Sequence, residues 1–343
     1  MKWFVMTNRE RTSKRSFGGD LESAGKLHFL SQDAKMPRRN RDLRVDYIGN
    51  SDDTGAVRDF AKQVRKELQK RAAALAAKGV QRKPSLLIYA HGFNNIYREA
   101  LEQYVGLRRN FQDAVGKETF EDQCLPVLFS WPSEGSSLTY LDDRDDARMS
   151  YPAVRHMVHI LLEETRQLED CISEICFLGH SLGVYVLREA FAALVSSPTA
   201  PAGTIMAQVL MIAADIGNKS LEPGGRGFGI NRFSDRVTVY FSPHDDVLRV
   251  SNRKNASRRL GRTLSTTFET TPDKVLFVDC RQWANDDKLR ELFGSRAPSV
   301  HSSYRSVPAI LRDMFRTVIG VDREVIPGRE TLTANKLYRL SAP

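Results

Sequence analysis

Cysteine is scarce in this sequence. The 343-residue chain has four cysteines, and none of them belongs to a C-x-x-C pair. Disulfide-stapled secreted domains need a denser set, and dithiol redox centres and zinc sites need closely spaced pairs. Cys176 and Cys280 lie in apolar, strand-like runs, which suits buried and reduced thiols. The cysteine pattern therefore argues against a disulfide framework and favours an intracellular protein.

Long hydrophobic runs are missing as well. The N-terminal apolar patch covers only residues 3–6, and no later run approaches the roughly 20 apolar residues of a membrane-spanning helix. We therefore expect no signal peptide, no transmembrane segment and a cytoplasmic location. Internal repeats and low-complexity tracts are also absent, which argues against a solenoid and against a largely disordered chain.

The charge balance is basic, with 51 Lys and Arg against 42 Asp and Glu and a net charge of +9. Both signs are interspersed along the chain, so we interpret the excess as a solvated surface. No nucleic-acid-binding motif accompanies it, and we expect no nucleic-acid partner. The densest basic stretch, residues 249–262, has helical character and leaves peripheral contact with an anionic membrane as an alternative that we do not favour.

Apolar runs of strand length alternate with stretches of helical periodicity. Predicted strands cover residues 3–8, 27–30, 43–48, 85–90, 126–130, 175–178, 209–214, 237–241 and 274–279. Predicted helices cover residues 54–78, 94–115, 152–170, 182–191, 247–262 and 301–319. This alternation favours an α/β fold with a mainly parallel, doubly wound sheet flanked by helices.

We expect one catalytic domain with additions at both ends. Residues 1–80 are predicted to form an N-terminal extension that packs on the same domain, and residues 81–320 the catalytic core. Residues 321–343 have weak patterning and are predicted to be a poorly ordered C-terminal tail. In sheets of this kind, ligand sites lie beyond the carboxyl ends of the strands, and the chemically informative residues of this chain follow predicted strands.

The stretch Gly179-His-Ser-Leu-Gly183 follows the apolar run 175–178 and precedes a helix-forming segment. A G-x-S-x-G at a strand-to-helix turn has the form of a nucleophile elbow. The glycines allow neighbouring chain to approach closely, and the sharp turn lifts the serine hydroxyl above the sheet at the positive end of a helix. Ser181 is therefore the candidate nucleophile.

A serine hydroxyl needs a base to take its proton and an acid to orient that base. Asp245 and His301 fit these roles, because both follow predicted strands and they occur after the nucleophile in the order acid, then histidine. Asp215 also follows a strand and is the runner-up acid, while Asp246 competes directly with its neighbour. The sequence favours Asp245 over both.

The oxyanion of acyl transfer needs fixed hydrogen-bond donors. We predict the backbone N–H groups of Leu182, directly after the nucleophile, and of Phe93, in the loop after strand 85–90. Side chains at neighbouring strand ends are predicted to line the substrate pocket: His91, Asn94, Ser130, Trp131 and Asp215. His156 and His159 share a helix face but have no acidic third ligand nearby, so we expect neither a metal nor an organic cofactor.

Together these features resemble the α/β-hydrolase superfamily. More narrowly, the chain is similar to an uncharacterised, largely bacterial family of α/β-hydrolases classed as a domain of unknown function. The matching stretches lie within residues 3–320 and are Thr7-Asn-Arg9, His91-Gly-Phe-Asn-Asn95, Phe129-Ser-Trp-Pro-Ser133 with Gly135, Gly179-His-Ser-Leu-Gly183, Tyr240 to Leu248, and His301-Ser-Ser-Tyr304. The G-x-S-x-G is superfamily-wide, whereas HGFNN followed by FSWPS is more specific.

The resemblance implies the triad and oxyanion donors already named, with Ser130, Trp131 and Pro132 lining the pocket. It departs after Asp215, where the family often has a proline and a second acid and this chain has Ile216-Gly-Asn218. The role of Asp215 is therefore left open.

We expect a serine hydrolase that cleaves a carboxylic ester, or another acyl bond, of a small molecule through an acyl-enzyme at Ser181. Two alternatives stand beside this hypothesis. One is a non-catalytic binding or scaffold protein on a hydrolase fold, and the other is a lipase or phospholipase acting at an anionic membrane surface. The sequence names neither the substrate nor the oligomeric state.

Overall fold

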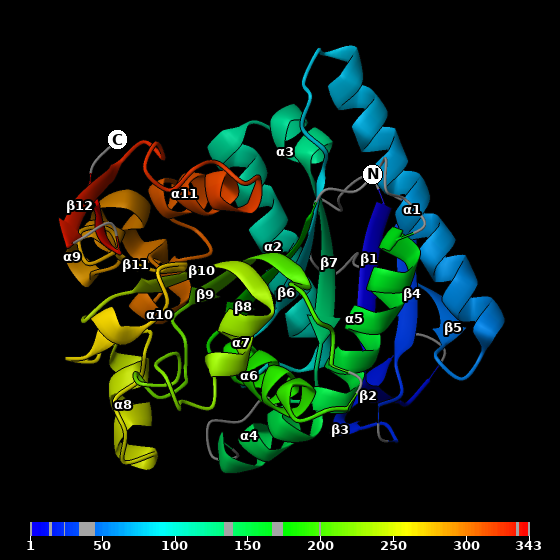
Figure 1. Cartoon of the computed structure of the whole chain (residues 1–343), viewed down its shortest axis with the longest axis horizontal. Coiled ribbons are helices and arrows are strands. Elements are labelled where there is room, and N and C mark those ends of the chain that lie inside the picture. The colour runs from blue at the N-terminus through cyan, green and yellow to red at the C-terminus, as the bar shows by residue number, and fades with distance from the viewer. Residues whose placement is uncertain are drawn as a thin grey trace.

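The computed structural model describes residues 2–13, 16–23, 25–33, 45–133, 140–166, 174–198, 200–333 and 336–341. These residues form a large twisted sheet with helices on both faces, an α/β fold (Figure 1). The strands are β1 (Lys2–Thr7), β2 (Arg9–Arg11), β3 (Phe17–Leu21), β4 (His28–Asp33), β5 (Asp46–Asn50), β6 (Ser85–Ala90), β7 (Cys124–Ser130), β8 (Glu174–His180), β9 (Met206–Ile212), β10 (Ser234–Phe241), β11 (Val275–Asp279), β12 (Arg329–Thr333) and β13 (Leu337–Leu340).

Within the described residues the main sheet has eleven strands in the order β12-β13-β11-β10-β9-β8-β6-β7-β1-β4-β5. The pairings from β13 through to β1 are parallel. The outer pairings, β12 with β13, β1 with β4 and β4 with β5, are antiparallel. Parallel neighbours align their carboxyl ends, so the loops after β6, β7, β8 and β10 all open at one edge of the sheet.

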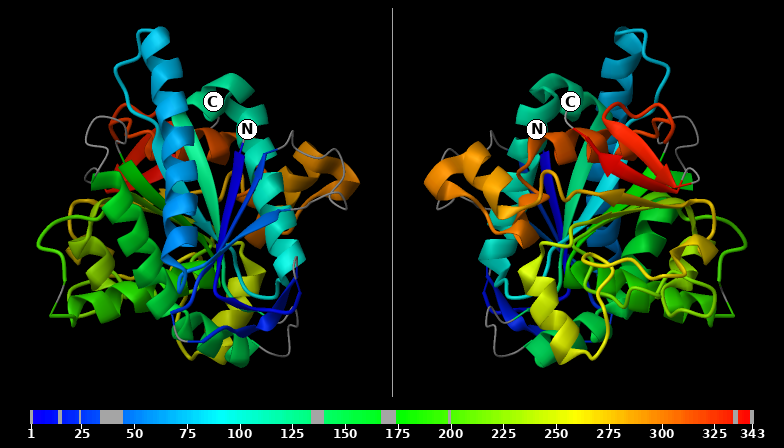
Figure 2. Two further views of the ribbon diagram at one scale, coloured as in Figure 1. Left: turned by 90° about the vertical axis from the view of Figure 1, so that its right-hand side faces the viewer. Right: turned by 90° about the vertical axis from the view of Figure 1, so that its left-hand side faces the viewer.

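The helices are α1 (Thr54–Ala77), α2 (Tyr97–Val115), α3 (Lys117–Gln123), α4 (Tyr140–Met149), α5 (Tyr151–Arg166), α6 (Leu182–Val195), α7 (Phe228–Arg232), α8 (Asp246–Lys254), α9 (Asp286–Phe293), α10 (Val300–Ser303) and α11 (Pro308–Val318), with short 3₁₀ turns at Phe268–Thr270 and Gly294–Arg296. Helices α1, α5 and α6 cover one face of the sheet, and α2, α9 and α11 cover the other (Figures 1 and 2).

Strand β6 shows how the core forms on both faces. All six of its residues are buried. Leu86 and Ile88 pack into the cluster that α1, α5 and α6 complete, whereas Leu87 and Tyr89 pack into the cluster of α2 and α11. The continuous apolar run predicted from the sequence is thus what a strand between two helical layers requires.

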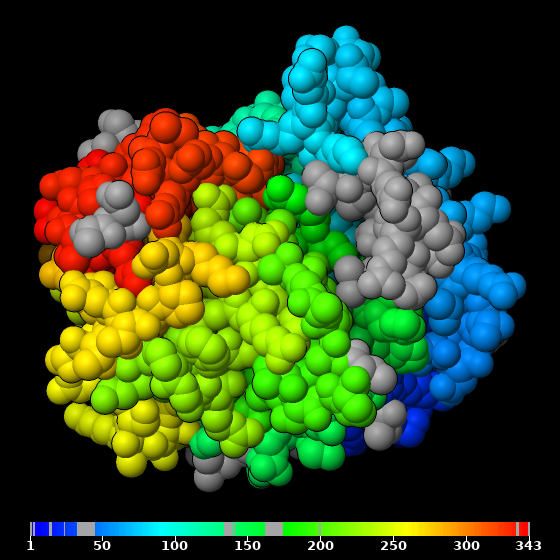
Figure 3. All heavy atoms as spheres, viewed as in Figure 1, coloured from blue at the N-terminus to red at the C-terminus, as the bar shows by residue number. Residues whose placement is uncertain are grey.

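Helix α1 has 24 residues, which makes it about 36 Å long. Asp53 caps its N-terminus, because the Asp53 carboxylate accepts a hydrogen bond from Gly55 N–H at 2.8 Å. The C-terminal end of this helix, shown in cyan at the top of Figure 3, projects beyond the main body. Helix α1 and strands β1, β4 and β5 lie within residues 1–80, and these three strands continue the main sheet.

Several predictions of secondary structure were wrong in detail. The tail is not poorly ordered in its described part, because β13 pairs with β11 and carries β12 at the sheet edge. The predicted final helix is divided into α10 and α11, since Pro308 lacks an N–H and disfavours helix before it. The basic helix ends at Lys254 rather than at residue 262. Residues 43–44 and 167–170 of two predicted elements lie outside the described residues.

Candidate active site

Ser181 lies at the turn between β8 and α6, in strained backbone geometry with φ 54° and ψ −121°. Positive φ is costly for a residue with a side chain and is common at functional turns. Gly183 makes the turn possible, because a Cβ there would lie 2.5 Å from the carbonyl oxygen of Ala90 and 2.6 Å from that of His91. The sequence motif therefore has the steric basis of a nucleophile elbow.

Asp245 and His301 meet beside this turn. Nδ1 of His301 lies 2.8 Å from Oδ2 of Asp245, and both side chains are buried. Asp245 also caps α8, since its Oδ1 accepts a hydrogen bond from Leu248 N–H at 2.9 Å. The helix-cap role and the orienting role thus use different oxygens of one carboxylate. A His held through Nδ1 keeps Nε2 available to exchange a proton with a nucleophile.

His180 connects the elbow to the histidine loop. Its Nε2 lies 3.0 Å from the backbone oxygen of His301, and the two imidazole centroids are 4.9 Å apart. Burial is the main reason that the pKa of His180 falls well below its usual value, so the neutral ring donates this hydrogen bond. His180, the residue before Ser181, therefore holds the backbone of His301.

The hydroxyl oxygen of Ser181 is buried and has no hydrogen-bond partner among the described residues. A buried hydroxyl without a partner is unusual in a folded protein. Catalytic hydrogen bonds are often loose in ligand-free structures and tighten when substrate binds. The free hydroxyl is thus compatible with a nucleophile at rest.

The two rival acids occupy other environments. Asp215 accepts hydrogen bonds from Tyr140 at 2.9 Å and from Ser251 at 2.6 Å, and Arg259 lies 3.4 Å away. Asp246 is 66% exposed in its side chain and pairs with Arg249 within α8. Neither carboxylate has a hydrogen bond to His301. The geometry therefore favours Asp245 as the orienting acid.

The predicted oxyanion donors lie on adjoining segments. Leu182 is the first residue of α6, so its N–H has no acceptor within the helix. A Cβ on Gly92 would lie 3.1 Å from Cβ of Ser181, which places the loop after β6 against the elbow. Phe93 follows in that loop, and no backbone acceptor for its N–H is found in the described part of the chain. Both N–H groups are thus available.

Most of the predicted pocket side chains are buried inside the protein. His91, Ser130 and Trp131 are 0% exposed and Asp215 is 2% exposed, while Asn94 is exposed on the loop. The His91 ring stacks on Trp131 with 5.2 Å between centroids, and Trp131 donates to the His91 carbonyl at 2.8 Å. His91, Ser130 and Trp131 thus contact one another beneath the loop after β6, and whether these residues line the pocket stays a prediction.

Burial also determines the charge state of His91. Desolvation, with a smaller contribution from the positive charge of Arg9, lowers the pKa of His91 to about 3. The ring is therefore neutral at physiological pH. Its Nδ1 donates to the Gly92 carbonyl at 2.7 Å.

A buried pair of charged residues, Arg9 and Asp143, lies beneath this loop and was not predicted from the sequence. Arg9 is 0% exposed and donates to Ser130 Oγ at 3.0 Å, Ser133 O at 3.2 Å and Asn95 O at 2.7 Å. Asp143 of α4 is also 0% exposed. Burial is the largest influence on Arg9 and lowers its pKa to about 10, although the charge of Asp143 opposes this shift. The only sequence signal was the place of Arg9 in the motif Thr7-Asn-Arg9.

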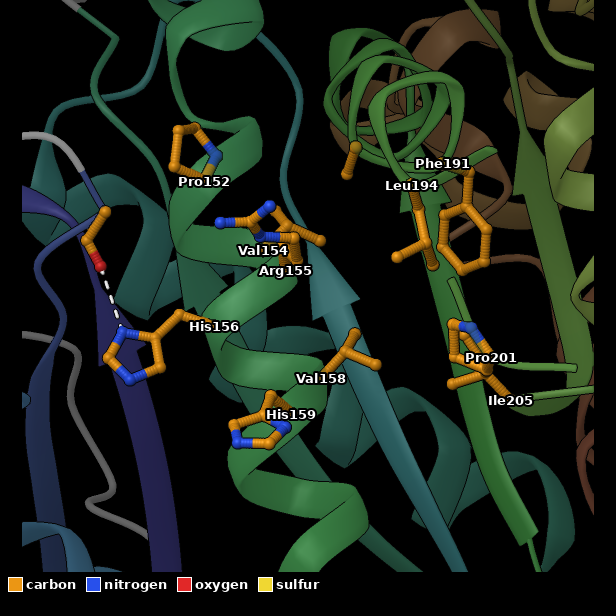
Figure 4. A pocket seen from close by; sticks show the side chains of 12 residues that line it. Pro152, Val154, Arg155, His156, Val158, His159, Phe191, Leu194, Pro201 and Ile205 are labelled. Atoms are coloured by element: carbon orange, nitrogen blue, oxygen red, sulfur yellow. Dashed lines mark hydrogen bonds between the residues drawn. The ribbon is translucent and has the colours of Figure 1, made fainter. Parts of the chain in front are cut away.

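A cavity of about 400 Å³ lies between α5 and α6 (Figure 4). His156 turns away from its centre to Gly25, whose carbonyl lies 3.2 Å from Nδ1. The lining does not include Ser181, Asp245 or His301, so we do not assign this cavity to their chemistry. Within the described ranges, no three His, Cys, Asp or Glu side chains form a group that could hold a metal ion.

Residues 64–311, more than half of the chain, match the model of a family described as alpha/beta hydrolase of unknown function (DUF900). The chain belongs to this family. The match agrees with the parallel sheet and with the resemblance noted in the sequence. A search of curated proteins found no match. In the part of the chain that is described, no helix combines the length and apolar character needed to cross a membrane.

Proposed function

We propose that this alpha/beta hydrolase cleaves a carboxylic ester, or another acyl bond, of a small molecule through an acyl-enzyme at Ser181. The observation that carries the proposal is the His301–Asp245 hydrogen bond of 2.8 Å beside a strained elbow serine. Nucleophile, base and acid come from three separate loops at the carboxyl edge of the sheet. Such a constellation is recognised by geometry and roles.

In the proposed reaction, His301 takes the proton of the Ser181 hydroxyl as Oγ attacks the acyl carbon. Asp245 holds the imidazole in the required tautomer and stabilises the imidazolium that forms. The negative oxygen of the tetrahedral intermediate accepts hydrogen bonds from Phe93 N–H and Leu182 N–H. When the intermediate collapses, His301 gives the proton to the leaving alcohol. A water molecule then attacks the acyl-enzyme with the same base and regenerates the serine.

The interpretation as a lipase at an anionic surface loses support from two of the basic residues that motivated it. Arg259 is buried against Asp215, and Arg262 donates to the backbone oxygen of Asp245 at 2.9 Å. These two side chains are part of the fold around the site rather than of a membrane-facing surface. A scaffold protein without activity would not need the His301–Asp245 bond beside an intact elbow, and we place this alternative second.

Hydrolysis of short p-nitrophenyl esters tests the proposal. Wild-type protein should release p-nitrophenol with saturation kinetics, and Ser181→Ala should reduce kcat by at least about 10³-fold with the fold intact. Ser196→Ala is a matched control, since Ser196 is exposed at the C-terminal end of α6, the end of that helix away from Ser181. Equal rates for wild type and Ser181→Ala would reject the proposed function.

A further inference from the structure

The loop that carries Phe93 is held by side chains that do not belong to the proposed triad. We propose that Asn95 and Asp143 are positioning residues that lock the backbone on both sides of Phe93, so that its N–H is fixed as an oxyanion donor. This inference rests on the proposed acyl transfer at Ser181. It assigns a role to two buried groups that neither the sequence motifs nor the family match explains.

Asn95 controls the peptide unit that contains the Phe93 N–H. Its side-chain Nδ2 donates to Gly92 O at 3.0 Å and to Phe93 O at 2.6 Å. The peptide group is planar, with its C=O and N–H pointing in opposite directions. Fixing the oxygen of Gly92 therefore fixes the direction of the N–H of Phe93. The Nδ1 of His91 donates to the same oxygen at 2.7 Å, so two donors hold this peptide.

Asp143 controls the next peptide unit. Its Oδ2 accepts hydrogen bonds from Asn94 N–H at 3.0 Å and from Ser133 Oγ at 2.6 Å. Asn94 has a φ of 59°, which is a costly conformation for a residue other than glycine. A buried carboxylate that binds its N–H offsets that cost and stops the peptide from turning over.

The two positioning residues are themselves held in place. The Oδ1 of Asn95 accepts a hydrogen bond from Gln103, its backbone N–H donates to Ser133 Oγ at 3.1 Å, and its carbonyl oxygen accepts from Arg9. The side-chain oxygen and nitrogen of Asn95 and its backbone N–H and C=O thus all have hydrogen-bond partners. A side chain with this many partners has one rotamer and one orientation, as preorganisation requires.

Helix α4, which carries Asp143, is hydrogen-bonded to the segments that follow β9 and α8. Tyr140 donates to Asp215 at 2.9 Å, and Arg144 donates to Asn255 Oδ1 at 2.7 Å. The ring of Tyr140 also meets that of Phe93 edge to face, with 5.6 Å between centroids. Helix α4 therefore connects the oxyanion loop to the segments that follow β9 and α8, and it holds Asp143 at a defined distance from Asn94.

Isosteric substitutions at Asn95 and Asp143 separate positioning from simple packing. A positioning role predicts that one substitution removes the hydrogen bonds and the other keeps them. Asn95→Asp keeps the shape but replaces the donor with an acceptor that repels the oxygens of Gly92 and Phe93. Asp143→Asn keeps an oxygen that can accept both hydrogen bonds, since both end on the single atom Oδ2. A residue that mattered only for packing would tolerate both changes equally.

The experiment measures kcat, KM and inhibition by a trifluoromethyl ketone, whose hemiketal oxyanion needs the same donors, on folded variants. We expect Asn95→Asp to lower kcat about 10²- to 10³-fold, as for loss of one oxyanion donor, with KM within about threefold. The inhibition constant should rise in parallel. Asp143→Asn should stay within about fivefold of wild type, and Asp143→Ala should approach the loss of Asn95→Asp.

Asp145→Ala is the matched control, because Asp145 lies on the same helix with its side chain 73% exposed. The inference is overturned if Asn95→Asp retains the kcat of the control, or if Asn95→Asp and Asp143→Asn lose equal activity. If Asn95→Asp does not fold, the same comparison is made with Asn95→Ala. Ser181→Ala is assayed alongside: its inactivity with unaffected Asn95 variants rejects only this inference, whereas its full activity rejects the proposed function as well.

Discussion

His301 and Asp245 are 56 positions apart in the sequence, yet His301 Nδ1 lies 2.8 Å from Asp245 Oδ2. The sheet brings them together, because Asp245 follows β10, whose parallel neighbour β11 precedes the loop that leads to His301. His180, one residue before the elbow serine, binds the His301 backbone from the other side. The acid, the base and the elbow are thus joined by direct contacts.

Substitution of Asp245 tests the orienting role. Asp245→Asn should lower kcat by about 10⁴-fold, because an amide favours the wrong tautomer of the histidine. The stability should change little, since the amide oxygen still accepts the hydrogen bond that caps α8. Asp246→Asn is the control, as that side chain is exposed and should leave kcat unchanged. The assignment of the acid fails if Asp246→Asn loses the activity and Asp245→Asn keeps it.

Two glycine substitutions test the steric basis of the elbow. Gly183→Ala should destabilise the fold by at least about 2 kcal/mol, because its Cβ would overlap the backbone oxygens of β6 and the loop after it. Gly106→Ala, within α2, should be neutral or stabilising by up to about 1 kcal/mol, since nothing lies within 4 Å of its Cβ. Urea unfolding of both variants gives the comparison, and equal stabilities would contradict the close approach at the elbow.

The neutral His91 predicts how stability depends on pH. The pKa of His91 is about 3 in the folded protein against 6.5 for an ordinary histidine, so between these values the unfolded chain binds the extra proton. The free energy of unfolding should therefore be highest above pH 6.5 and fall with decreasing pH, by up to about 1.4 kcal/mol per pH unit for this residue. His180 acts in the same direction.

His91→Asn removes one of these two contributions. Thermal or urea unfolding between pH 7 and pH 4 should then show a shallower decline for the variant than for wild type. Parallel declines for the two proteins would mean that His91 is protonated in the folded state, in conflict with its complete burial.

Much of the fold was predictable because strands buried on both faces have continuous apolar sequences. The bounds of β6 match the predicted strand at residues 85–90, and the bounds of α1 differ from the prediction by one residue at its end. Edge strands carry weaker signals, since β12 has exposed and half-buried positions only. The sequence therefore did not predict the β12–β13 hairpin or the short β2–β3 pair.

The sequence predicts the proposed triad from order and position, because a glycine-flanked serine after one strand is followed by an acid and a histidine after later strands. The sequence does not predict the support beneath the loop. Arg9 and Asp143 are charged, and charged side chains are rarely buried, so no sequence pattern predicts that both are 0% exposed. Their partners are largely backbone atoms and hydroxyls of distant segments, which no local pattern encodes.

Covalent labelling tests the central claim most directly. Wild-type protein is incubated with a fluorophosphonate probe, and the adduct is located by mass spectrometry of peptides, with Ser181→Ala and heat-unfolded wild type as controls. Our account predicts one adduct per chain, on Ser181, which is absent from both controls. A folded wild-type protein that forms no adduct on Ser181, or a Ser181→Ala protein that is labelled at the wild-type rate, would contradict it.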